Sequence, residues 1–266
     1  MKNLFSLRTV FLVVLISILV AFFSGGLIMS IGISTSHKSE KLYTFISFII
    51  GQASMLVPLL YYISLKKAPL FRTIRLNPIS SQILLYTILF SLGLIIISDE
   101  LDRIMQIFIP APDYITDLDQ LLRPDTIMGF ILLFIAVSIF APIGEEILFR
   151  GFLQQFLEKY WKDTTKAILA TSVIFSAIHF NPYWFIQIYL LGIMLGFLTW
   201  KTNSVIPSII LHGLNNTMAM LFSFSDSAES SFYAFNGHVA PWIIVFAIII
   251  TISGFKGISQ AKNKKL

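Results

Sequence analysis

The chain has 266 residues, of which 56% are hydrophobic and only 12% are charged. A soluble domain carries roughly 25% charged residues, so a soluble protein of this size could not cover its surface with so few charges. The apolar residues also gather in blocks of about 16 to 25 residues, the length that crosses a bilayer. The composition predicts a polytopic membrane protein, and it excludes a nucleic-acid-binding interpretation of the net charge of +5.

Cysteine is absent from the chain. A disulfide framework, a thiolate metal site and a cysteine nucleophile are therefore excluded. The length would suit one or two soluble domains, and here it predicts one integral membrane domain over residues 1–266.

Eight apolar blocks follow one another along the chain. The first follows Lys2 and Arg8 as a signal peptide would, but no small-residue cleavage pattern comes after it, so we expect a retained helix. The pattern predicts an all-α bundle of about eight transmembrane helices. The expected spans are 10–33, 42–65, 83–98, 127–143, 167–180, 183–200, 205–224 and 239–255.

The basic residues of the loops predict the orientation. If both termini are cytoplasmic, most of the nineteen Lys and Arg residues lie on the cytoplasmic side. The exceptions are Lys38, Lys41, Arg103 and Arg123. This asymmetry is typical of the positive-inside rule, so we expect both termini in the cytoplasm.

Polar residues inside the apolar blocks point to function, because a charge near the bilayer centre costs on the order of 2.5–3.5 kcal/mol even on permissive scales. The first such cluster closes the block 127–143. Glu146 and Arg150 are four residues apart and can form an ion pair on one helix face. Glu145 points about 100° away, which leaves it as a candidate general base. The alternative is a charge cluster that only closes a helix end.

Two further clusters follow on later helices. Phe175 and His179 are four residues apart and are expected on one helical face, as are His212 and Asn216. Each histidine and the asparagine can donate hydrogen bonds to an oxyanion, and the histidines can also bind a metal. The alternatives are a packed histidine and hydrogen bonds between helices.

Together the three clusters favour hydrolysis inside the membrane. They supply carboxylates, imidazoles, a guanidinium and a carboxamide, which can activate water and stabilise a tetrahedral intermediate. A metal-assisted reaction would use similar residues, with Glu145, His179 and His212 as zinc ligands. From the residues alone the two mechanisms stay open.

The ordered motifs Glu-Glu-x-x-x-Arg, Phe-x-x-x-His and His-x-x-x-Asn resemble the CPBP family. Its members are the type II CAAX prenyl endopeptidases and their bacterial relatives, the Abi proteins, which are linked with bacteriocin processing or immunity. The resemblance covers the predicted catalytic core helices, residues 127–220, and none of the three motifs departs from the family pattern.

The resemblance implies a role for each matching residue. Glu145 would be the general base, His179 would hold or help to deprotonate the water, and His212 and Asn216 would form the oxyanion site. Glu146, Arg150 and Phe175 would position this site. We favour a glutamate-dependent reaction that needs no cofactor, with zinc as the alternative.

The expected substrate is a membrane-associated peptide or protein, in CAAX-type processing, bacteriocin processing or immunity. The expected surroundings are a lipid bilayer, namely a bacterial plasma membrane, with no nucleic acid partner. The competing hypothesis is a non-enzymatic immunity factor, scaffold or transporter-like protein that uses the same polar residues for binding. Paired broken helices and repeated halves, which many transporters have, are not apparent in the sequence.

Overall fold

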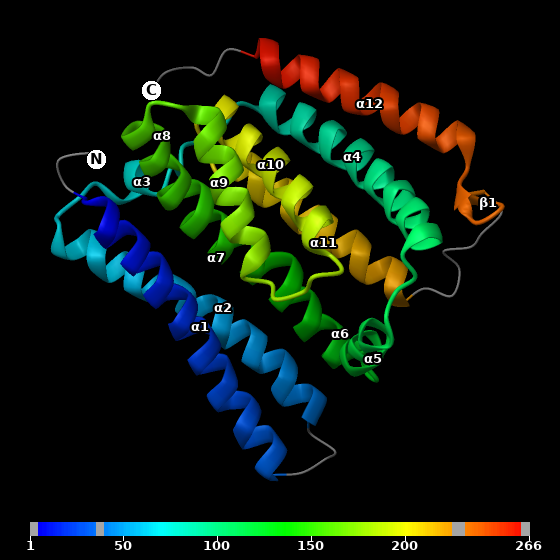
Figure 1. The fold of residues 1–266 in the computed structure, drawn as a ribbon, viewed down its shortest axis with the longest axis horizontal. Coiled ribbons are helices and arrows are strands. Elements are labelled where there is room, and N and C mark those ends of the chain that lie inside the picture. Colours follow the sequence, from blue (N-terminus) through cyan, green and yellow to red (C-terminus); the bar gives the residue numbers. More distant parts are fainter. Residues whose placement is uncertain (1–4, 36–39, 225–231, 262–266) are drawn as a thin grey trace. The chain divides into compact units, whose positions relative to one another are not determined.

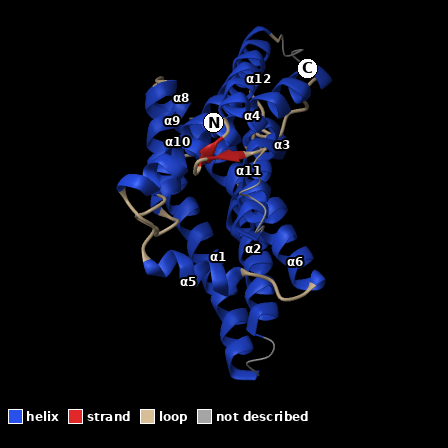
Figure 2. Ribbon diagram, turned by 90° about the vertical axis from the view of Figure 1, so that its right-hand side faces the viewer, coloured by secondary structure: helices blue, strands red, loops and turns tan. Residues whose placement is uncertain are grey.

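A computed structural model describes residues 5–35, 40–224 and 232–261. These residues are almost entirely helical, with one short hairpin (Figure 2), so the predicted all-α class is confirmed. Lys38 and the two ends of the chain lie outside the described residues. The cytoplasmic location of both termini stays a prediction.

Among the described residues, six helices are long and apolar enough to cross a membrane. The prediction of a polytopic membrane protein is thereby confirmed, while the count of eight spans stays a prediction. The expected span 167–180 forms a helix of 14 residues, and the expected span 205–224 forms a helix of 19 residues that includes His212, Asn215 and Asn216. The six spans are Leu7–Ser34, Lys41–Leu65, Ser81–Phe108, Ile127–Trp161, Phe185–Thr202 and Pro241–Gln260.

The chain divides into two compact units, each built from two separate stretches of sequence. The first comprises Met1–Pro78 and Pro124–Ile209. Its elements are α1 (Leu7–Thr35), α2 (Glu40–Leu65), α3 (Leu70–Thr73), α6 (Ile127–Phe134), the π-helical segment η2 (Ile135–Phe140), α7 (Ala141–Glu146), the π-helical segment η3 (Ile147–Gln154), α8 (Gln155–Trp161), α9 (Thr164–Ala177) and α10 (Phe185–Thr202).

The second unit comprises Ile79–Arg123 and Ile210–Leu266. Helices α4 and α12 lie side by side in it (Figure 1), and Gly254 permits this approach, because a Cβ there would lie 2.6 Å from the Phe90 amide nitrogen. Helix α11 begins in the first unit and lies mostly in the second. The elements are α4 (Ser81–Phe108), α5 (Asp113–Leu122), α11 (Ile206–Phe224), β1 (Ala234–Phe235), β2 (His238–Val239) and α12 (Pro241–Gln260).

One continuous helix of 35 residues, Ile127–Trp161, carries the two adjacent acids. Pro142 lacks the amide hydrogen that would continue the α-helical ladder, and its ring would clash with the preceding turn. The preceding segment η2 has π geometry, in which the Ala141 amide bonds to the Ala136 carbonyl. The helix therefore continues past Pro142 as a π-bulge, a feature frequent at functional sites. The prediction that the acids close the end of a helix is wrong, because they lie within this one.

Helices α1 and α2 pack closely as an antiparallel pair (Figure 1). Small residues permit this contact, as is usual between membrane helices. A Cβ at Gly51 would lie 3.0 Å from the Ala21 carbonyl oxygen, and one at Gly25 would lie 3.1 Å from the Ser47 carbonyl oxygen. The side chain of Ser24 also bonds to that of Ser54 at 2.6 Å.

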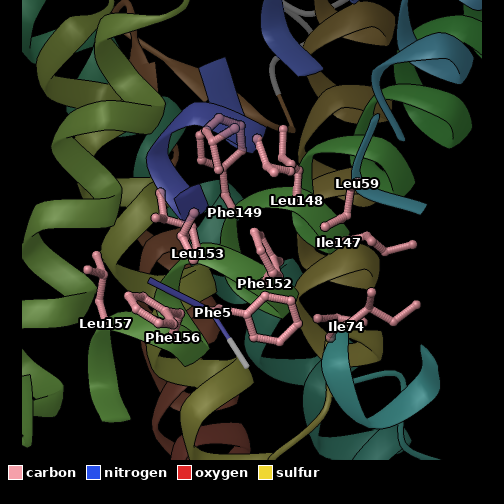
Figure 3. Packing of buried hydrophobic residues seen from close by; sticks show 14 of the residues in the cluster. Phe5, Leu59, Ile74, Ile147, Leu148, Phe149, Phe152, Leu153, Phe156 and Leu157 are labelled. Carbon is pink, nitrogen blue, oxygen red and sulfur yellow. The ribbon is translucent and has the colours of Figure 1, made fainter. Parts of the chain in front are cut away.

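The hydrophobic core of the first unit surrounds the segment η3 and the start of α8. Phe149, Phe152 and Phe156 are all buried there, and Phe5 packs edge-on against Phe152 (Figure 3). Side chains of α1, α2 and α9, together with Ile74 and Val205, complete the cluster. The helix that carries the acids is thereby fixed on several sides.

Candidate functional site

The charged pair of the first motif is completely buried. The Arg150 Nη1 donates to Glu146 Oε1 at 2.7 Å, and both side chains have 0% exposure. This is the ion pair predicted from the spacing. Because each buried ion loses several kcal/mol of solvation, such a pair persists only with good geometry and further hydrogen bonds.

Further hydrogen bonds come from α10. Arg150 Nη2 donates to the Gly192 carbonyl at 3.4 Å, and Gln154 Nε2 donates to the Gly196 carbonyl at 3.0 Å. The two glycines allow this approach, since a Cβ at Gly196 would lie 2.8 Å from Gln154 Oε1.

Phe175 connects the first motif to the second. The Arg150 guanidinium carbon lies 4.0 Å from the centre of the Phe175 ring, and this ring contacts the His179 imidazole edge-on at 4.9 Å. His179 Nδ1 also bonds to the Phe175 carbonyl at 2.7 Å. A carbonyl only accepts, so Nδ1 carries the hydrogen and Nε2 of the neutral ring is the acceptor.

His179 lies in the turn after α9, and the expected helix to residue 180 ends at Ala177. Phe180 follows with a φ of 50°, a left-handed conformation in which a bulky residue is a genuine outlier. Its ring packs against that of Phe22 at 5.9 Å. Next, the side chain of Asn181 accepts from the Tyr183 and Trp184 amides and so orders the entry into α10. His179 thus sits in a fixed turn and not on a helical face.

Glu145 and His179 line one cavity of about 510 Å³. Glu145 is only 6% exposed, whereas His179 is exposed. Most of the wall is apolar and comes from the helices of the first 60 residues, which the three motifs do not include. The lining residues are Ile18, Ala21, Phe22, Gly25, Gly26, Met29, Ser47, Phe48, Gly51, Gln52, Met55, Glu145, Ile178, His179 and Phe180.

Gln52 of α2 is a site residue that sequence reasoning missed. Its Nε2 donates to Glu145 Oε1 at 3.0 Å, and it lines the same cavity. Its side chain is a neutral amide, so the pattern of ionisable groups in the apolar blocks does not indicate it. A lone glutamine within the block 42–65 was the available signal.

The third motif lies on α11 in the second unit. His212 is buried, and Asn216 follows it four residues later on the same helix. The structure therefore brings Glu145, Glu146, Arg150, Phe175 and His179 together in the first unit. The meeting of His212 and Asn216 with Glu145 stays a prediction.

A zinc centre requires a particular set of protein ligands. A catalytic zinc ion takes three protein ligands. In the part of the chain that the structure describes, no group of three His, Asp or Glu side chains could hold a metal ion. His212 belongs to the second unit, so zinc binding by Glu145, His179 and His212 stays the alternative, and no step of the reaction below is routed through a metal.

The fold and site define a class: a polytopic, all-α integral membrane protein with a buried Glu–Arg pair and a Glu–His cavity. Residues 127–218 match the family described as type II CAAX prenyl endopeptidase Rce1-like. The resemblance predicted from the three motifs is confirmed for this segment, which spans the two acids through Asn216.

Two relatives share part of the chain. An uncharacterized 24.3 kDa protein of Escherichia coli is 28% identical over 118 residues, which are 43% of this chain and 53% of the relative. The UPF0177 protein YbdI of Lactococcus lactis subsp. lactis is 27% identical over 144 residues, 52% of this chain and 77% of the relative. The chain thus spans about half of the first relative's length. No solved structure matches.

The buried pair predicts the effect of Arg150→Met on stability. Because Glu146 would keep a buried charge without its partner, we expect a loss of about 3–5 kcal/mol. Thermal and denaturant unfolding of the purified protein in lipid nanodiscs will measure it.

Lys41→Ala is the matched control, since the Lys41–Asp125 pair is partly exposed, at 33% and 72%, and should contribute less than about 1 kcal/mol. The double variant Glu146→Leu with Arg150→Met should recover part of the loss. Equal effects of Arg150→Met and Lys41→Ala would contradict a structural role of the buried pair.

Proposed function

We propose that the protein is an intramembrane endopeptidase that hydrolyses peptide bonds of membrane-associated peptides or proteins. The observation that carries the proposal is that Glu145 and His179 line one cavity. The match of residues 127–218 to an endopeptidase family supports it.

In the proposed reaction, Glu145 is the general base. A water molecule between Glu145 and His179 gives one proton to the carboxylate while its oxygen bonds to the carbonyl carbon of the substrate. The resulting tetrahedral intermediate expels the amine, which takes up the proton from Glu145. One water is consumed and the C–N bond breaks. A carboxylic acid and an amine form, and transfer of the acid's proton to the amine gives a carboxylate and an ammonium group.

The remaining motif residues support this step. His179 accepts a hydrogen bond from the water through Nε2, the nitrogen that its bond to the Phe175 carbonyl leaves as acceptor. The guanidinium of Arg150 lies over the Phe175 ring and positions it, and Glu146 accepts a hydrogen bond from Arg150. On this proposal, His212 and Asn216 donate hydrogen bonds to the oxyanion, a contribution typically worth 10²–10³-fold in kcat per donor.

The apolar walls of the cavity favour a substrate with a bulky apolar group near the scissile bond. Candidate substrates are prenylated CAAX-type proteins, bacteriocin precursors and other membrane-associated peptides. The Escherichia coli and Lactococcus lactis relatives support a location in a bacterial plasma membrane.

Glu145→Gln and His179→Ala test the chemistry. Each variant should lower the cleavage rate by at least about 10²-fold, because general base catalysis contributes 10²–10⁴-fold. The assay uses purified protein in nanodiscs with quenched-fluorescence peptides, one prenylated with a CAAX end and one unprenylated and apolar. Mass spectrometry of the products locates the cut.

Asp125→Asn removes an exposed acid outside the cavity and serves as the control with unchanged rate. Full activity of Glu145→Gln would contradict its role as the base. A wild-type protein that binds these peptides without cutting them would favour the non-enzymatic hypothesis.

Gly26 offers a test of the cavity as the substrate site. A Cβ at Gly26 would meet no atom within 4 Å, although the residue lines the cavity, so Gly26→Leu should fill the space without disturbing the helix contact. We expect kcat/KM to fall about 10-fold or more at unchanged thermal stability. Leu19→Phe, at an exposed position of α1 outside the cavity, is the control. Unchanged kinetics of Gly26→Leu would place substrate elsewhere.

The proposal also predicts that cleavage does not require zinc. Activity should persist in protein that contains no zinc by elemental analysis and has been treated with a chelator. Loss of activity on metal removal, restored by stoichiometric zinc, would support the alternative in which Glu145, His179 and His212 are ligands.

A further inference from the structure

We propose that Gln52 of α2 is a positioning residue that holds the Glu145 carboxylate in its reactive orientation. This inference rests on the proposed function, since it assigns a partner to the general base. Its observation is the hydrogen bond of 3.0 Å from Gln52 Nε2 to Glu145 Oε1, between residues far apart in the sequence.

Neighbouring residues pack around Gln52 in a way that accommodates its contact with Glu145. An amide inside an apolar membrane helix is costly unless it is hydrogen bonded. Gly144 makes room for it, because a Cβ there would lie 3.1 Å from the Gln52 backbone oxygen and 3.5 Å from its Oε1. On the other side, Gly51 packs against the Ala21 carbonyl, which fixes the backbone of α2 next to Gln52. The backbone that carries Gln52 is thus packed on both sides.

The amide also suits a group that changes its protonation during turnover. Its NH₂ end donates to the carboxylate, and its oxygen could accept from the protonated acid after a flip of the amide. In the described structure Gln52 Oε1 is buried and makes no hydrogen bond, so it can accept one from a protonated Glu145. A leucine of similar size would fill the space but could form a hydrogen bond with neither the charged nor the protonated form of Glu145.

Gln52 also lies outside the segment that matches the endopeptidase family. That match covers residues 127–218, whereas Gln52 comes from a helix near the start of the chain. The general base is therefore oriented from one direction by its own helix and from another by α2.

The test compares Gln52→Leu, Gln52→Glu and the control Ser54→Ala in the nanodisc assay with the prenylated CAAX-type peptide. Gln52→Leu should lower kcat about 10- to 100-fold, the effect of losing a hydrogen bond to a charged group, with KM changed less than about threefold. Ser54 bonds to Ser24 on α1 and not to Glu145, so Ser54→Ala should leave both constants unchanged.

Gln52→Glu should give a pH dependence that a packing defect alone would not produce. An acid at this position can donate to Glu145 only while one of the two carboxyls holds a proton. Its activity relative to wild type should therefore rise as the pH falls. The other titratable groups near the position are His179 in the cavity and the Glu146–Arg150 pair on the helix of Glu145, and they are common to both proteins.

Infrared spectroscopy tests the contact without any substrate. The carboxylate bands of Glu145, identified as the difference between wild type and Glu145→Gln, should shift in Gln52→Leu. Unshifted bands, or a Gln52→Leu variant with normal kcat, would overturn the role of Gln52. If Glu145→Gln is inactive in the same experiment, the proposed function stands without it. If the wild type cleaves neither peptide, the shift of the carboxylate bands in Gln52→Leu still shows whether Gln52 contacts Glu145.

Discussion

The buried ion pair between Glu146 and Arg150 is the interaction on which the rest of the site depends. Two ions with no exposure to solvent are stable only when their surroundings satisfy them. Here the surroundings are the backbone of α10, which accepts from the guanidinium, and the ring of Phe175, which lies against its face. Since the same ring contacts His179, the ion pair sets the place of a side chain on a different part of the chain.

The two adjacent acids face different surroundings because the helix turns between them. Glu146 faces the arginine inside the protein, while Glu145 faces the cavity and bonds to Gln52. In the proposed function, this separation leaves Glu146 to hold Arg150 inside the protein and Glu145 to face the water in the cavity. A single acid could not both anchor the helix and accept a proton from water.

The apolar blocks and the residue spacing predicted much of this from sequence. Hydrophobic length identified a membrane protein, and the four-residue spacing identified the ion pair. The helix end was misplaced because Pro142 and the charged residues resemble a terminus, while the surrounding core and a π-bulge let the helix continue. The turn at His179 was missed because only tertiary contacts, such as that of Phe180 with Phe22, reveal it. Gln52 was missed because its partner is distant in sequence.

The cavity draws its two kinds of residue from different parts of the chain. Glu145 and His179 come from the segment shared with the endopeptidase family, whereas α1 and α2, which supply most of the wall, precede that segment. Apart from Gln52, the wall residues of α1 and α2 can therefore change without altering the side chains that are proposed to react. Proteins descended from a common ancestor could keep the same reaction and diverge in the peptides they accept, so shared motifs in such a lineage do not by themselves imply a shared target.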